Sequence, residues 1–104
     1  MKKATPKEAC EAVSGDHRGS LLDVRQPAEY HGGHVAGSRL IPLGELSAKI
    51  AAIDRSAPVY VLCRSGARAA SAVAVLARQG FDARVIDGGI LAWAAAGLPV
   101  EKGD

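Results

Sequence analysis

The sequence is poor in the features that mark several large classes of proteins. Its 104 residues include only two cysteines, Cys10 and Cys63, which are too few for a disulfide framework and have no metal-ligand spacing. No apolar run approaches the length of a membrane-spanning helix, so we expect no membrane contact. The net charge is only +2 and no run is rich in lysine or arginine, so we expect no nucleic-acid partner.

What the chain does contain is typical of one small globular domain. Hydrophobic residues make up 48% and charged residues 23%, a balance that argues against a disordered chain. We therefore expect a single domain over residues 1–104. The chain is expected to act as a monomer. The first residues, MKKATPKEAC, carry lysines but no apolar stretch, so no secretory signal is expected. A chain with free thiols and no such signal is expected in the reducing cytoplasm.

Short apolar runs alternate with helical patterns along the chain. The predicted strands cover residues 20–25, 38–42, 58–63 and 83–87. The predicted helices run from Thr5-Pro6 to a stop near Ser14-Gly15, over 46–53, over 67–80 and over 90–97. Such an alternation predicts an α/β fold, with a mostly parallel sheet that has helices on both faces. Ligands of these sheets bind beyond the carboxyl ends of the strands, where Cys63 follows the clearest predicted strand.

The segment CRSGAR, residues 63–68, joins that strand to a helix. A cysteine is a nucleophile only as the thiolate, and the free N–H groups and dipole of a helix start favour an anion there. Gly66 allows the backbone to fold tightly, and Arg68 in the first helical turn could hold an anion beside the sulfur. The alternative is an inert core cysteine, which is a common environment for this residue type. The polar, glycine-containing loop favours the nucleophile.

Four segments of the sequence resemble those of the single-domain rhodaneses, a family of sulfurtransferases. They are LLDVRQPAEYHGGHVAGS (21–38), IPLGEL (41–46), CRSGAR (63–68) and IDGGILAWAAAGLPV (86–100). The four occur in the family's order and spacing, and together they cover nearly the whole chain. The resemblance implies the rhodanese-like three-layer fold with a five-stranded sheet.

The resemblance also implies a thiosulfate sulfurtransferase of the rhodanese type. In that chemistry Cys63 takes the sulfane sulfur of a small donor, thiosulfate or a persulfide, and carries it as a persulfide. A thiol, or cyanide in an assay, then accepts the sulfur, and no cofactor is needed. The loop residues would bind the donor and stabilise the sulfur: Arg64, Ser65, Gly66, Ala67 and Arg68.

Several polar residues near the first signature are expected to support the site rather than react. We expect Arg25 to pair with Glu29, and Asp23 to hold backbone amides of a neighbouring loop; shaping of the substrate rim is the alternative. His34 matches a Gly-His step of the family and is expected to be structural. With only His31 beside it and no further ligand at a suitable spacing, no metal site is expected.

Three other features have simple structural interpretations. Gly88-Gly89 is expected to form a turn after a strand. Trp93 is expected to be a core residue of the last helix. Cys10 lies among small apolar residues on the first helix and is expected to be a small core residue, with a resolving thiol as the less favoured alternative.

Two other functions remain open. A non-catalytic sulfur-carrier or regulatory module would share the fold; inactive relatives usually lack the cysteine, whereas Cys63 is present. A cysteine phosphatase or arsenate reductase also places a cysteine loop before a helix. Relatives with this fold that act on such oxyanions typically have a loop one residue longer, whereas here four residues separate Cys63 from Arg68. Sulfur transfer is therefore the favoured function.

Overall fold

The sheet has five strands, and the computed structural model describes residues 1–14 and 19–103. The strands are β1 (Lys3–Ala4), β2 (Ser20–Asp23), β3 (Arg39–Leu40), β4 (Val59–Leu62) and β5 (Ala83–Ile86). Their order across the sheet is β1-β5-β4-β2-β3, and all four pairings between them are parallel. The predicted α/β fold with a five-stranded sheet is confirmed, and the sheet is parallel throughout.

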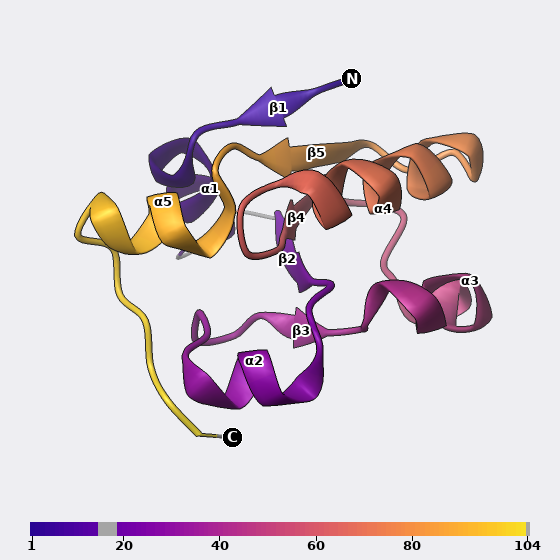
Figure 1. The fold of residues 1–104 in the computed structure, drawn as a ribbon. Helices are drawn as coiled ribbons and strands as arrows, with labels where there is room; N and C mark the ends of the chain where they lie inside the picture. Colours follow the sequence, from indigo (N-terminus) through magenta and orange to yellow (C-terminus); the bar gives the residue numbers. More distant parts are fainter. Residues whose placement is uncertain (15–18, 104) are drawn as a thin grey trace.

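Helices cover both faces of this sheet. They are α1 (Pro6–Val13), α2 (Pro27–Gly32), α3 (Leu46–Lys49), α4 (Ala67–Arg78) and α5 (Gly89–Ala95), with short 3₁₀ turns η1 (Leu43–Glu45) and η2 (Ile50–Ala52). Helices α1 and α5 lie on one side of the sheet, α3 and α4 lie on the other, and α2 lies beside the β3 edge (Figure 1). Within the described ranges no helix has the length and apolar character that a bilayer crossing requires.

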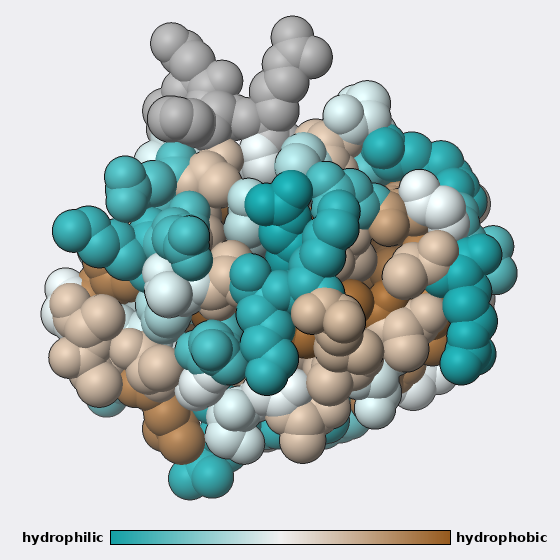
Figure 2. Space-filling view, turned by 90° about the horizontal axis from the view of Figure 1, so that it is seen from above, coloured by the Kyte–Doolittle hydropathy of each residue, from teal (hydrophilic) through white to brown (hydrophobic). Residues whose placement is uncertain are grey.

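Each face of the sheet packs into its own hydrophobic cluster, because successive strand side chains point to opposite faces. In β4, Val59 and Val61 join the cluster beneath α4, whereas Tyr60 and Leu62 join the cluster beneath α1 and α5. Trp93 is 1% exposed and belongs to the second cluster, which confirms the expected core position. The outside is mixed: on the face seen in Figure 2, hydrophilic side chains alternate with smaller hydrophobic areas.

The first helix begins as its sequence predicts. The Glu8 amide donates to the Thr5 hydroxyl at 3.1 Å, and the Glu8 carboxylate accepts the Thr5 amide at 2.8 Å, which forms a capping box. The helix ends at Val13 with Ser14 as its cap. The predicted stop at Gly15 lies outside the described residues.

The sequence pattern did not reveal one strand and one helix, and it predicted a third element as a longer helix than the structure contains. Strand β1 is only two residues long and contains a lysine, so it has no apolar run to reveal it. Helix α2 has no buried residue and therefore no apolar periodicity. Its start does repeat the X-Pro-x-Glu pattern of α1, as Gln26-Pro27-Ala28-Glu29, which was the available signal. The predicted helix over residues 46–53 is wrong as a continuous helix, since a single α-helical turn is followed there by the turn η2.

Candidate active site

Cys63 lies directly after β4, at the carboxyl edge of the sheet. The residue is 1% exposed, and its Sγ accepts the N–H of Gly66 at 2.9 Å. Gly66 has a φ of +122°, a backbone conformation that other residues rarely adopt, and it immediately precedes α4. The loop thus folds back so that an amide at the start of α4 points to the sulfur, as predicted from the strand–loop–helix sequence.

A second helix fixes the same loop from the other side. The amide of Ile90 donates to the carbonyl of Cys63 at 2.8 Å, and the amide of Leu91 donates to the carbonyl of Arg64 at 3.3 Å. Gly89 packs so closely that an added Cβ would lie 2.4 Å from both carbonyl oxygens. Gly88 and Gly89, at the start of α5, therefore form more than a turn. They let α5 bind the loop carbonyls, and the role of Gly89 was missed because it depends on a contact distant in sequence.

Arg68, in the first turn of α4, forms a two-pronged ion pair with Glu29 of α2. Its guanidinium nitrogens lie 2.6 Å and 2.8 Å from the two carboxylate oxygens, and both side chains are about one-third exposed. The Glu29 carboxylate also accepts the Gln26 amide at 3.0 Å. The hydrogen bonds from Arg68 are the main reason that the pKa of Glu29 is lowered to about 2. The pKa of Arg68 is raised, chiefly by Glu29 and to a smaller extent by the charge of Cys63.

Arg25 has a different partner from the one predicted. Its guanidinium forms a buried ion pair with Asp23, at 2.7 Å for the shortest contact, and donates at 2.8 Å to the Gly33 carbonyl. It contacts Glu29 through that residue's backbone carbonyl, at 3.3 Å. The predicted pairing of Arg25 with the Glu29 carboxylate is therefore wrong, because Arg68 occupies that carboxylate. Asp23 accepts the amide of Arg25, two residues further along the chain, at 3.0 Å, and this amide belongs to its own turn and not to a neighbouring loop.

His34 holds the C-terminal segment against α2. The imidazole is buried and stacks on Tyr30 with ring centroids 4.0 Å apart, and Nε2 lies 3.3 Å from the carboxylate of Glu101. The backbones of His34 and Glu101 exchange two hydrogen bonds of 2.8 Å. In residues 1–14 and 19–103 no group of three or more His, Cys, Asp or Glu side chains could hold a metal ion.

Cys10 is not brought to the site. It packs at the border of the cluster beneath α1 and α5, whereas Cys63 belongs to the cluster on the opposite face of the sheet. The Cys10 Sγ lies 4.0 Å from the hydroxyl of Ser14, the residue that caps the end of the same helix. A resolving role for Cys10 therefore has no support in the geometry.

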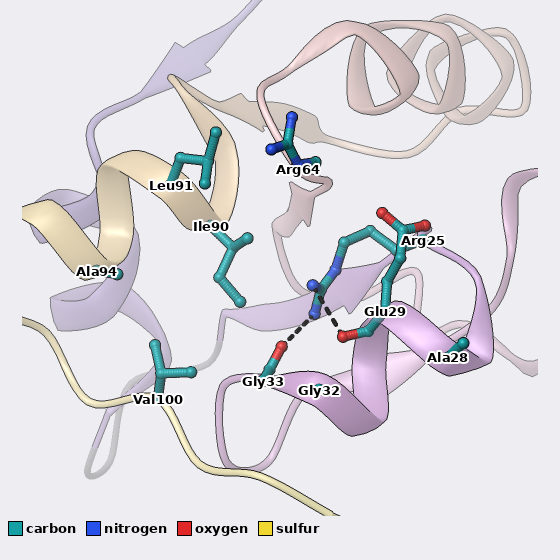
Figure 3. A pocket seen from close by; sticks show the side chains of 10 residues that line it. All are labelled: Arg25, Ala28, Glu29, Gly32, Gly33, Arg64, Ile90, Leu91, Ala94 and Val100. Atoms are coloured by element: carbon teal, nitrogen blue, oxygen red, sulfur yellow. Dashed lines mark hydrogen bonds between the residues drawn. The ribbon is translucent and has the colours of Figure 1, made fainter.

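An open groove of about 370 Å³ runs beside the Cys63 loop, between α2 and α5 (Figure 3). Arg64 stands at its rim; the residue is exposed, and its side chain forms no hydrogen bond or ion pair with any residue described by the structure. The opposite side carries Arg25 and Glu29, and the wall formed by α5 is apolar. The lining residues are Arg25, Ala28, Glu29, Gly32, Gly33, Arg64, Ile90, Leu91, Ala94 and Val100.

The chain is similar to known proteins over most of its length. A family model described as "Rhodanese-like domain" matches residues 5–96. A sulfurtransferase of Allochromatium vinosum is 39% identical over 82 residues, which cover 77% of this chain and 76% of the relative. The thiosulfate sulfurtransferase GlpE of Pseudomonas paraeruginosa is 40% identical over 74 residues, or 70% and 67% of the two chains.

The structural comparison agrees with the sequence comparison. A rhodanese-related protein from Thermoplasma volcanium matches with a TM-score of 0.90 and 32% identity, over 97% of this chain and 98% of the other. Several other curated relatives are longer, and the chain covers only 24% to 38% of their length.

The ion pair between Glu29 and Arg68 predicts a specific loss of stability in acid. Because the pKa of Glu29 falls from 4.5 to about 2 on folding, its contribution is complete above pH 4.5 and is lost as the pH falls toward 2. Glu29→Gln should lower the unfolding free energy by about 1 kcal/mol at pH 6, and this gap should shrink between pH 4.5 and 2. Urea unfolding across this range measures it; a gap independent of pH would contradict the prediction.

The close contact of Gly89 predicts that this position accepts no side chain. Gly89→Ala should cost about 1–3 kcal/mol more than Gly97→Ala, because its Cβ meets two backbone carbonyls. Gly97 is the matched control: it also has a positive φ, of +78°, but an added Cβ there meets nothing within 4 Å. Both substitutions carry the left-handed backbone cost of about 1–2 kcal/mol. Equal urea midpoints for the two variants would disprove the steric argument.

Proposed function

The chain belongs to the rhodanese-like domain family, and from this we propose that it is a sulfurtransferase that carries the transferred sulfur on Cys63. The observation that carries the proposal is the 2.9 Å hydrogen bond from the Gly66 amide to the Cys63 sulfur at the start of α4. A fixed N–H donor and the positive end of a helix favour a negative charge on that sulfur. The naming of relatives at 39% and 40% identity as sulfurtransferases supports the same chemistry.

The proposed reaction has two displacement steps. The Cys63 thiolate attacks the sulfane sulfur of thiosulfate; a new S–S bond forms, the old S–S bond breaks, and sulfite leaves with the bonding electrons. The Gly66 amide, 2.9 Å from Cys63 Sγ, lies beside the S–S bond of the resulting persulfide anion. An acceptor thiolate or cyanide then attacks the outer sulfur and releases the Cys63 thiolate. Product leaves before the acceptor binds, so ping-pong kinetics are expected.

The two loop arginines have different roles in this proposal. Arg68 is committed to Glu29 and ties the start of α4 to α2, so it positions the loop. Arg64 is exposed and keeps its charge available at the rim of the groove, so it supplies the cation that attracts an anionic donor. Arg68 was expected to hold the anion from its position in the sequence, and its pairing with Glu29 moves that task to Arg64.

Phosphate-ester or arsenate chemistry is the less favoured alternative. A phosphoryl group brings three peripheral oxygens that each need a donor, and so it requires a wider ring of amides than a single sulfur atom. Only four residues lie between Cys63 and Arg68, and none of them is an acid that could protonate a leaving alkoxide. A sulfur carrier without turnover would use the same persulfide and differ only in rate.

Cys63→Ser should abolish transfer from thiosulfate to cyanide, because a hydroxyl cannot form the persulfide. Cys10→Ser is the matched control and should keep most of the activity, since Cys10 packs on the other face of the sheet. Intact mass after thiosulfate treatment should rise by one sulfur atom in the wild type and in Cys10→Ser only. Sulfur transfer by Cys63→Ser would refute the mechanism.

The same preparation should hydrolyse an aryl phosphate negligibly while it turns over thiosulfate and cyanide. The physical reason is the short loop between Cys63 and Arg68. Both rates are measured side by side, with Cys63→Ser as the blank for each. Cys63-dependent phosphate release at a rate that matches sulfur transfer would overturn the assignment. A sulfur-loaded protein without turnover would instead identify a carrier.

A further inference from the structure

We propose that the groove beside the Cys63 loop selects an organic sulfur donor, one with an apolar body and a single negative charge next to the sulfane sulfur, over inorganic thiosulfate. The inference rests on the proposed function, because it concerns the donor of the same reaction. It follows from three properties of the groove: its charge, its walls and its rigidity.

The groove has one uncompensated positive charge. Arg25 is neutralised by Asp23, and the Glu29 carboxylate is neutralised by Arg68. Arg64 alone among the charged lining residues has no ionic partner in the described parts of the chain. A monoanion therefore complements the groove, whereas the second negative charge of thiosulfate has no second unpaired cation among the lining residues that the structure describes.

The walls are apolar and larger than thiosulfate requires. Leu91 is 50% exposed and Val100 is 40% exposed, and both line the groove together with Ile90 and Ala94. Exposed apolar side chains gathered in a concave site gain free energy when an apolar ligand covers them. The groove of about 370 Å³ would leave a sulfate-sized ion surrounded by water, while a ring or short alkyl chain would contact the walls.

Both apolar walls are held in place by backbone contacts. Leu91 is fixed by its own amide, which donates to the Arg64 carbonyl at 3.3 Å. Val100 is held between Pro99, whose carbonyl accepts the Trp93 indole N–H at 2.9 Å, and Glu101, which exchanges two hydrogen bonds with His34. Figure 3 shows Leu91 and Val100 on the same side of the groove, with Ile90 pointing between them and Arg25. A preformed wall pays little ordering entropy on binding.

Benzenethiosulfonate has the required chemistry and serves as the probe. The Cys63 thiolate attacks its terminal sulfur, the S–S bond to the sulfonyl group breaks, and benzenesulfinate leaves with the bonding electrons. Two negative charges enter and two leave, so no oxidant, reductant or proton is needed. Methanethiosulfonate reacts identically and has the same charge, so the two donors differ in the size of the apolar body.

The test compares kcat/KM for benzenethiosulfonate, methanethiosulfonate and thiosulfate, with cyanide as acceptor. Each rate is divided by that of a small free thiol with the same donor, which removes the intrinsic reactivity. In the wild type the corrected value should be at least about tenfold higher for the benzene than for the methane compound. The ratio in this test is the corrected kcat/KM for benzenethiosulfonate divided by that for methanethiosulfonate. Leu91→Ser and Val100→Ser should each lower this ratio about three- to tenfold. Ala95→Ser is the control, because Ala95 is exposed on α5 but does not line the groove.

The outcomes separate the inference from the function on which it rests. A falling ratio in both groove variants, with an unchanged ratio in Ala95→Ser, supports the organic donor. Transfer from thiosulfate with a ratio near one, or a ratio that the groove variants leave unchanged, overturns the inference and leaves sulfur transfer standing. No transfer from any of the three donors overturns the proposed function itself. Circular dichroism of each variant verifies that the fold is retained.

Discussion

The carboxylate of Glu29 is the contact on which the geometry of the site depends. It caps the start of α2 through the Gln26 amide and binds both guanidinium nitrogens of Arg68 at the start of α4. Arg25 extends this connection to the sheet edge, since it bonds the Glu29 carbonyl and the buried carboxylate of Asp23. One acid thus fixes two helix starts and leaves the remaining loop arginine with a free charge.

The polar contacts of the Cys63 sulfur and its loop come mainly from the backbone. The carbonyls of Cys63 and Arg64 are bound by the first amides of α5, while the amide of Gly66 faces the sulfur. Two loop carbonyls are thus bound by α5, and one loop N–H points to the sulfur. This arrangement of backbone dipoles involves no polar side chain. Gly66 and Gly89, which shape this backbone, both have a positive φ.

How much the sequence predicts depends on whether a feature is local. The sequence predicts strand β4 and helix α4 from their apolar patterns, and the Thr5 capping box from four consecutive residues. The structure confirms all three. The partner of Arg25 was predicted wrongly because two carboxylates, those of Asp23 and Glu29, are close to it in sequence and either could pair with it. Only the approach of Arg68, 39 residues after Glu29, decides between them. The contact of Gly89 with the loop carbonyls is equally non-local, and no periodicity reports it.

The C-terminal segment, residues 99–103, contributes to the groove without being part of the packed sheet and helices. Residues 99–103 lie outside the helices and strands, yet hydrogen bonds join them to Trp93, His31 and His34. Val100 of this segment lines the groove. Proline, valine and glutamate at positions 99–101 are exposed, so they contribute little to the hydrophobic clusters. A substitution at Val100 therefore changes the wall of the groove at a residue that belongs to neither hydrophobic cluster. The segment that completes the groove is thus largely separate from the residues that form the two clusters.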